Sequence, residues 1–326
     1  MSFTSRSGTD IVCGLCPNGC RISPGGAGVC RIRRNEGGEL SLPYFGKLSA
    51  VSSDPVEKKP LYHFFPGRQI LSLGFYGCSL RCPFCQNYRI SQEVDSSART
   101  VSPEECVDLA LNHGSFGIAY TYSEPLVHFE YVMETSHKAR EKGLKNVLVT
   151  NGYLNPEPAS AILEVTDAAN VDLKTFSDDF YRDELGGSLK PVLRFIEEAA
   201  SAVHLEVTTL VIPGKNDSEK EISEIAKFLA SLDRGIPLHL SAYYPTYTYV
   251  IEATPPEAVL RLTSLASEYL DYVYPGNIAG PSDTRCPSCG SLLIERRGYH
   301  TRITGLEGGS CISCGHPIPV ILSPRQ

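Results

Sequence analysis

The stretch that decides the fold is GFYGCSLRCPFCQN, residues 74–87, which places three cysteines in one short loop. Cys78, Cys82 and Cys85 have C-x3-C-x2-C spacing, and the loop continues an apolar, β-prone run. A cubane iron–sulfur cluster normally takes four thiolates, so three thiolates would leave one iron with an open position. Open positions are where metal sites do chemistry, as at catalytic zinc. The alternative is a zinc site that a distant His or Cys completes.

Segments typical of strands and of helices alternate regularly from this loop onward. The expected strands are apolar runs, as in strands that are buried on both faces of a parallel sheet. These strands are expected at 69–78, 116–122, 146–152, 168–176, 204–214, 236–245 and 272–280. The expected helices lie at 102–114, 125–143, 156–166, 190–202, 217–233 and 254–270. Six β/α pairs predict a parallel sheet, open or curled into a barrel.

Several helix starts carry capping signals. Ser102 is expected as an N-cap with Pro103 in the first turn. Asp217 or Ser218 is expected to cap the helix near 220, and Thr254 the last helix.

Polar motifs follow the expected strands at their carboxyl ends. YTYSEP at 120–125 follows the second strand, VTNG at 149–152 the third and DLK at 172–174 the fourth. In β/α barrels the active site lies at this end of the strands. Taken alone, Ser123 and Glu124 are better explained as caps of the following helix. Their shared location with the other motifs indicates a common site.

The cysteine loop resembles the cluster motif of the radical S-adenosylmethionine (SAM) superfamily. The resemblance implies a [4Fe-4S] cluster on Cys78, Cys82 and Cys85, whose open iron binds the amino and carboxylate groups of SAM. It implies that an electron from the cluster splits the sulfonium of SAM and gives a 5′-deoxyadenosyl radical, which abstracts hydrogen from a substrate. Phe84 and Asn87 are implied beside the cofactor.

The strand-end motifs resemble those of glycyl-radical activating enzymes such as pyruvate formate-lyase activating enzyme. The resemblance implies further cofactor-binding residues, namely Thr121, Ser123, Glu124, Asn151, Asp172 and Lys174. Lysine is a natural partner of the SAM carboxylate, and Asp172 is implied for a monovalent cation or a ribose hydroxyl. Thr208 stands where those enzymes use an arginine.

Almost the whole chain resembles the AmmeMemoRadiSam system radical SAM enzymes. Stretches that carry this likeness are CGLCPNGCRI, DPVEKKPLYHFFPG, AYTYSEP and CPSCGSLLIERRGY. It implies an α/β fold, a partial (β/α)6 TIM-like barrel with small cysteine-rich metal-binding N- and C-terminal extensions. The divisions are expected at 1–60, 61–280 and 281–326. Implied partners are SAM, an electron donor such as a flavodoxin or ferredoxin, and Memo-like and AMMECR1-like proteins. The substrate, a protein glycine or a small metabolite, is not identified.

Eight further cysteines form two sets. Cys286, Cys289, Cys311 and Cys314 have C-x2-C-x21-C-x2-C spacing with a glycine after each pair, which favours a zinc ribbon. Cys13, Cys16, Cys20 and Cys30 have C-x2-C-x3-C-x9-C spacing, for which zinc and an auxiliary iron–sulfur cluster are equally open. Cys106 stands alone and is expected to be a small buried hydrophobe on a helix.

Composition limits the classes of partner. The chain has 326 residues and a formal net charge of −7, which argues against a general affinity for nucleic acid. No long apolar run or apolar leader is seen, so no membrane partner and a cytoplasmic location are expected. Arg296 and Arg297 are expected on a solvated edge, although they could touch phosphate. Two alternative functions stay open. One is a non-enzymatic zinc-binding module that interacts with nucleic acid or protein, and the other is a radical SAM enzyme that modifies RNA.

Overall fold

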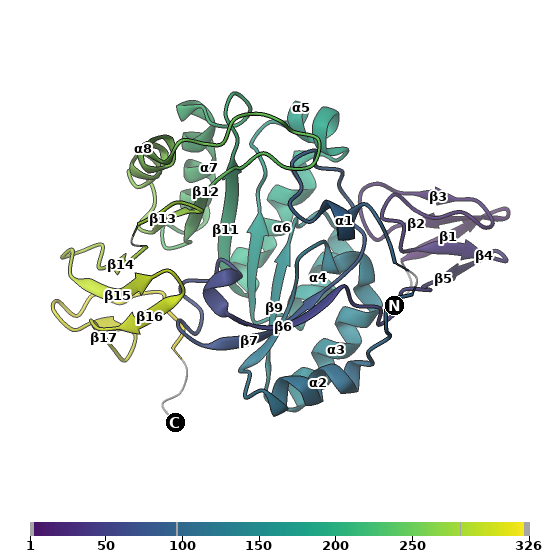
Figure 1. Ribbon diagram of the computed structural model, residues 1–326, viewed down its shortest axis with the longest axis horizontal. Coiled ribbons are helices and arrows are strands. Elements are labelled where there is room, and N and C mark those ends of the chain that lie inside the picture. The colour runs from purple at the N-terminus through teal and green to yellow at the C-terminus, as the bar shows by residue number, and fades with distance from the viewer. Residues whose placement is uncertain (1–2, 96, 281, 323–326) are drawn as a thin grey trace.

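The computed structural model describes residues 3–95, 97–280 and 282–322 (Figure 1). Its centre is an eight-stranded sheet with the strand order β13-β12-β11-β10-β9-β8-β7-β6. The seven strands from β7 to β13 are parallel, and the edge strand β6 pairs antiparallel with β7. The strands are β6 (Ala50–Pro55), β7 (Gln69–Gly74), β8 (Gly117–Thr121), β9 (Lys145–Thr150), β10 (Ala168–Asp172), β11 (His204–Val211), β12 (Leu238–Ala242) and β13 (Val273–Gly276).

Helices join the consecutive parallel strands (Figure 1). The α-helices are α1 (Tyr88–Ser91), α2 (Pro103–Asn112), α3 (Phe129–Glu141), α4 (Pro156–Glu164), α5 (Asp178–Phe180), α6 (Leu189–Ala202), α7 (Glu219–Leu232) and α8 (Pro256–Ala266). Short 3-10 helices lie at η1 (Val56–Lys58) and η2 (Pro125–His128), and η3 (Tyr181–Leu185) is a π-helix. The six β/α pairs and the open, mainly parallel sheet confirm the predicted α/β fold.

Burial and capping explain why these segments form. All five residues of β8 are buried, as expected for a strand that is covered on both faces. The hydroxyl of Ser102 accepts a hydrogen bond from the amide of Glu105 at 3.1 Å, and the Glu105 carboxylate accepts from the Ser102 amide at 2.7 Å, which completes a capping box. Ser218 caps α7, as expected. The predicted Thr254 cap is wrong, because this hydroxyl donates to the carbonyl of Val211 at 2.6 Å instead.

The N-terminal segment forms a small β module of its own. One antiparallel sheet contains β1 (Thr4–Ser7), β2 (Asp10–Cys13) and β3 (Arg21–Ile22), and a hairpin contains β4 (Arg34–Glu36) and β5 (Glu39–Ser41). The strand β6 lies inside the range 1–60 that was expected to be an extension, yet it pairs with β7 of the main sheet. We therefore propose that the N-terminal extension ends before residue 50.

The C-terminal segment forms a second β module, on the opposite side of the molecule from the N-terminal one (Figure 1). It contains β14 (Thr284–Arg285), β15 (Leu292–Arg297), β16 (His300–Ile303), β17 (Leu306–Glu307) and β18 (Ser310–Cys311).

The expected solvated edge of this module is wrong for Arg296, which is 1% exposed. Its guanidinium donates to the hydroxyl of Thr284 and to the carbonyl of Tyr62, each at 2.7 Å. Arg296 therefore anchors the module to the chain that precedes β7, while Arg297 stays exposed. No helix among the described residues is long and apolar enough to cross a membrane.

Candidate functional site

A cavity of about 320 Å³ lies between the cysteine loop and the carboxyl ends of the parallel strands. Ten of the residues that sequence predicts for the site line it, and they are Cys78, Cys82, Phe84, Cys85, Asn87, Ser123, Glu124, Asn151, Asp172 and Lys174. Thr121, the buried last residue of β8, does not line this cavity, which is lined instead by the turn that follows it. Residues that follow three neighbouring strands thus meet the cysteine loop at one place.

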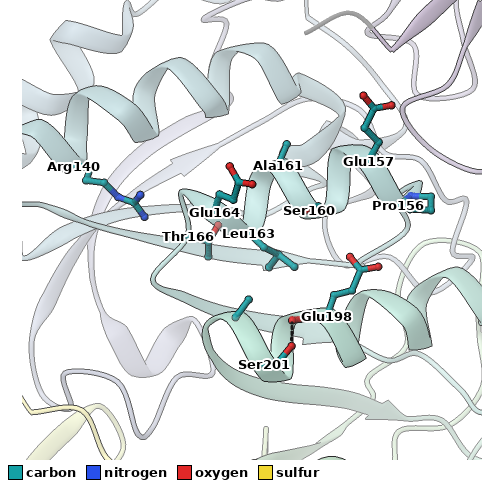
Figure 2. A pocket seen from close by; sticks show the side chains of 11 residues that line it. Arg140, Pro156, Glu157, Ser160, Ala161, Leu163, Glu164, Thr166, Glu198 and Ser201 are labelled. Carbon is teal, nitrogen blue, oxygen red and sulfur yellow. Dashed lines mark hydrogen bonds between the residues drawn. The ribbon is translucent and has the colours of Figure 1, made fainter.

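A larger pocket of about 940 Å³ lies elsewhere, on the outer helices α4 and α6 (Figure 2). It is lined by the carboxylates of Glu157, Glu164 and Glu198 and by the guanidinium of Arg140. None of the predicted site residues or cysteines lines it. The cavity at the strand ends, although smaller, is therefore the one of the two that contains thiol ligands.

The three cysteine sulfurs lie in a polar, partly enclosed setting. The Cys78 sulfur accepts from the amide of Leu80 at 3.4 Å and from the side-chain amide of Asn151 at 3.6 Å. The Cys85 sulfur is 3.3 Å from the Ser91 hydroxyl. Such contacts stabilise metal-bound thiolates. Burial raises the pKa of Cys82 to about 12, so a metal centre that binds this sulfur must displace its proton.

The four C-terminal cysteines have the geometry of a site for one metal ion. The sulfur of Cys286 is 3.6 Å from that of Cys314, and the sulfur of Cys289 is 3.7 Å from that of Cys311. All four sulfurs lie within 4.8 Å of one another. A tetrahedral ion with metal–sulfur bonds of about 2.3 Å separates its ligands by about 3.8 Å. The set therefore fits a metal-binding extension.

The cysteine loop is arranged differently. Within the described ranges, the C-terminal set is the only group of three or more Cys, His, Asp or Glu ligands that gathers so tightly. Cys78, Cys82 and Cys85 are not such a group, and among the described cysteines they alone line the cavity. Because a polynuclear cluster takes each thiolate on a different iron, it holds its ligands farther apart than a single ion does. Three thiols at one cavity are the donor set that the predicted iron–sulfur cluster requires.

The turn after β8 is strained and firmly held. Tyr122 has a φ of 73°, a left-handed conformation that is costly for a tyrosine. Its hydroxyl donates to the carboxylate of Asp54 at 2.7 Å, and the ammonium of Lys59 lies 4.5 Å from the centre of its ring. Its carbonyl accepts from the side-chain amide of Asn87, and the neighbouring Ser123 hydroxyl donates to a backbone carbonyl of the cysteine loop. These contacts fix the turn against that loop.

Glu124 joins two strand ends beneath the cavity. One of its carboxylate oxygens accepts from the amide of Leu126 at 3.1 Å and from the hydroxyl of Thr150 at 2.8 Å. The other oxygen accepts from the amide of Asn151 at 2.8 Å. Glu124 thus caps η2, as the simpler explanation held, and also lines the cavity. Burial raises the pKa of this carboxyl to about 7, so its charge changes near neutral pH.

Lys174 and Asp172 form an ion pair in the cavity wall. The ammonium of Lys174 is 2.8 Å from the Asp172 carboxylate. Burial disfavours the ammonium, but the charge of Asp172 outweighs it and holds the pKa of Lys174 above its usual range. The lysine therefore stays cationic beside the cysteine loop and suits an anionic ligand group.

Several residues of the cavity were not expected from the sequence. Lys58 and Pro60 reach it from the segment before β7, and Ser241 and Asn277 reach it from the ends of β12 and β13. The rule that active sites lie at carboxyl ends of strands could have found Ser241 and Asn277. Nothing in the local sequence places Lys58 there, because it precedes the first parallel strand.

Comparisons with known proteins agree with this geometry. The profile of the radical SAM superfamily matches residues 73–229. The chain is 39% identical over 332 residues to the uncharacterized protein MJ0808 of Methanocaldococcus jannaschii, covering 99% of each chain. It is 24% identical over 188 residues to pyruvate formate-lyase 1-activating enzyme of Escherichia coli K12, covering 55% of this chain and 75% of that enzyme. The crystal structure of Streptococcus suis SuiB bound to S-adenosylmethionine has a similar fold, with a TM-score of 0.52 and 12% identity, over 68% of this chain and 53% of SuiB.

Proposed function

We propose that this chain, which belongs to the radical SAM superfamily, is an activating-enzyme-like enzyme that cleaves SAM reductively. The observation that carries the proposal is the cavity in which Cys78, Cys82 and Cys85 meet the polar ends of the strands. These three cysteines would hold the [4Fe-4S] cluster that the superfamily implies. When bound, the cluster supplies the electron that converts SAM to methionine and a 5′-deoxyadenosyl radical, which abstracts hydrogen from a substrate not yet identified.

The other residues of the cavity would bind and orient SAM. Glu124 accepts three hydrogen bonds from the protein. The oxygen that accepts from the amide of Asn151 can accept one more, which suits the amino group of SAM. Lys174 provides a positive charge for the SAM carboxylate, and Asp172 holds that ammonium in place. Asn151 fixes the orientation of the Cys78 sulfur.

Residues of the loop itself would shield the cluster. Phe84 is 3% exposed and packs against the rings of Phe180 and Tyr249, with centroids 6.3 and 5.7 Å away. Asn87 ties the loop to the turn at Tyr122. Ser123 ties the same turn to the carbonyl of Phe75 at 2.7 Å. Thr121 would act only by supporting this turn, since its carbonyl accepts from the amide of Ser123 at 3.1 Å.

The proposal also covers the partners of the protein, its location and its C-terminal metal. We assign the chain to the AmmeMemoRadiSam system, with Memo-like and AMMECR1-like partners and a flavodoxin or ferredoxin as electron donor, in the cytoplasm. The C-terminal cysteines would hold zinc, since the distances between their sulfurs suit a tetrahedral site. The buried Arg296 weakens the rival of a nucleic-acid-binding ribbon, because its guanidinium is already bonded within the protein.

The test is formation of 5′-deoxyadenosine from SAM by protein reconstituted anaerobically with iron and sulfide and reduced with dithionite. We expect product from the wild type and none from Cys82→Ala. The matched control is Cys106→Ser, because Cys106 is buried on α2 with its sulfur 3.0 Å from the hydroxyl of Tyr131, and serine keeps a hydrogen-bonding group there. The control should retain full product formation. A colourless wild type that carries only zinc, or product formation by Cys82→Ala equal to that of wild type, would overturn the proposal.

A further inference from the structure

The N-terminal β module packs directly on the loop that carries the site cysteines. The side-chain amide of Asn18 donates to the carbonyl of Ser79 at 2.8 Å. Gly77 has a φ of 79°, and a Cβ at this position would lie 2.4 Å from the carbonyl oxygen of Cys30. Only glycine allows so close an approach of the two backbones. The residue before Cys78 therefore touches one member of the N-terminal cysteine set.

A second contact joins the two cysteine sets from another side. Cys16 lines a cavity of about 10 Å³ together with Ser79, Glu124 and Asn151. The side-chain amide of Asn151 donates to the Ser79 hydroxyl at 3.1 Å as well as to the Cys78 sulfur at 3.6 Å. The side chain of Asn151 thus lies between the small cavity that Cys16 lines and the sulfur of Cys78, a ligand of the candidate cluster.

The module is also fixed to α3 and to the start of α4, next to the central sheet. The Arg33 guanidinium is 1% exposed and donates to both carboxylate oxygens of Glu130 in α3, at 2.7 and 2.8 Å. The side-chain amide of Asn155, just before α4, donates to the carbonyl of Gly14 at 2.7 Å. With two such anchors, the N-terminal cysteines keep a fixed place beside the site.

The arrangement of these cysteines indicates the kind of metal centre. Cys13 and Cys30 are buried, and Cys16 and Cys20 are half-buried. No three of the four sulfurs gather within 4.8 Å in the residues described, in contrast to the C-terminal set. In this respect they match Cys78, Cys82 and Cys85. Four thiolates without another ligand are a donor set for zinc or for an iron–sulfur cluster, and the wider spread favours the cluster.

We infer that Cys13, Cys16, Cys20 and Cys30 hold a second iron–sulfur cluster, of two or four irons, beside the loop that carries the cysteines of the SAM site. This inference concerns a different set of ligands from the proposed function and does not depend on SAM cleavage.

The experiment counts metals in three anaerobically reconstituted variants. One lacks the site ligands (Cys78→Ala, Cys82→Ala, Cys85→Ala), one lacks N-terminal ligands (Cys16→Ser, Cys20→Ser), and the control lacks C-terminal ligands (Cys289→Ser, Cys314→Ser). We expect the first variant to keep two to four irons per chain with matching sulfide and to stay brown. The second variant should keep only about four irons per chain. The control should lose metal without losing iron.

The outcomes separate the two proposals. If the variant without site ligands has no iron and carries zinc at the N-terminal cysteines, the second cluster is refuted while the site cluster stands. If removal of the site ligands leaves the iron content unchanged and removal of the N-terminal ligands abolishes it, the second cluster stands and the proposed function fails. Should the N-terminal variant not fold, the metal content of the first variant still decides the question. Electron paramagnetic resonance also tests whether the two clusters are neighbours. Magnetic coupling between two adjacent reduced clusters should broaden the wild-type signal. The signal should be narrower in the variant without site ligands and in the variant without N-terminal ligands, because each has one cluster.

Discussion

Replacing Glu124 with Gln tests the polar half of the proposed SAM site. The carboxylate accepts three hydrogen bonds from the protein and has room for about one more, on the oxygen that accepts from Asn151. In Glu124→Gln, the amide nitrogen would take the place of this oxygen. A donor would then face the Asn151 amide, and the acceptor that remains for SAM would be lost.

The magnitude follows from one hydrogen bond to a charged group. Such a bond contributes about 1.5–3 kcal/mol, which corresponds to about 10- to 150-fold in the dissociation constant of SAM. The wild type should also show a pH dependence. Burial raises the pKa of Glu124 to about 7, and SAM requires the ionised carboxylate, so binding below this pH must release a proton. With half of the carboxyl ionised at pH 7 and about a tenth at pH 6, the dissociation constant should therefore rise about fivefold between these pH values.

Calorimetry of SAM binding to the reconstituted, unreduced protein measures both effects. We expect weaker binding by Glu124→Gln and a flat pH profile between 6 and 8. Glu105→Gln is the matched control, because Glu105 caps α2 and does not line the cavity, so its variant should bind SAM as the wild type does. An unchanged dissociation constant for Glu124→Gln, or a wild-type affinity independent of pH, would refute the assigned role.

Three further predictions concern the surroundings of the site. Lys174→Met should weaken SAM binding about tenfold or more in calorimetry, because it removes the charge that Asp172 holds in place; unchanged affinity would argue against this role. Cys289→Ser should release the C-terminal metal and remove hydrogen-exchange protection from β14 to β18 while the central sheet stays protected, and retention of that metal would contradict the site. Arg33→Met should lower the free energy of unfolding by about 3 kcal/mol in urea, because it leaves the Glu130 carboxylate without its partner, whereas a loss below about 1 kcal/mol would show that the pair is not needed.

The regular part of the fold was predictable because its signals are local. Buried parallel strands read as apolar runs, and the capping box at Ser102 is visible in four residues of sequence. The edge strand β6 was missed because AVSSDP is mostly polar and half-exposed, and only its pairing with β7 makes it a strand. The cap at Thr254 failed for a related reason, since a distant carbonyl of β11 competes for its hydroxyl.

The residues of the site likewise fall into those that local sequence predicts and those that it does not. The spacing of Cys78, Cys82 and Cys85 and the strand-end motifs pointed to ten residues that do line one cavity. The position of Lys58 at the cavity and the burial of Arg296 both depend on the segment before β7, which lies between the sheet and the C-terminal module. Local sequence does not predict such a contact between distant segments. Thr121 was expected at the cavity because it belongs to the right motif, but it is still part of β8, and only the turn residues after it line the cavity.

The central claim is that three cysteines leave one iron open to SAM. Electron–nuclear double resonance of the reduced protein with SAM that carries 15N at its amino group tests this directly, with the variant that lacks N-terminal ligands used to avoid a second signal. The account predicts a nitrogen hyperfine coupling large enough to require an iron–nitrogen bond, absent from Cys82→Ala. A cluster signal without any such coupling, at saturating SAM, would contradict it.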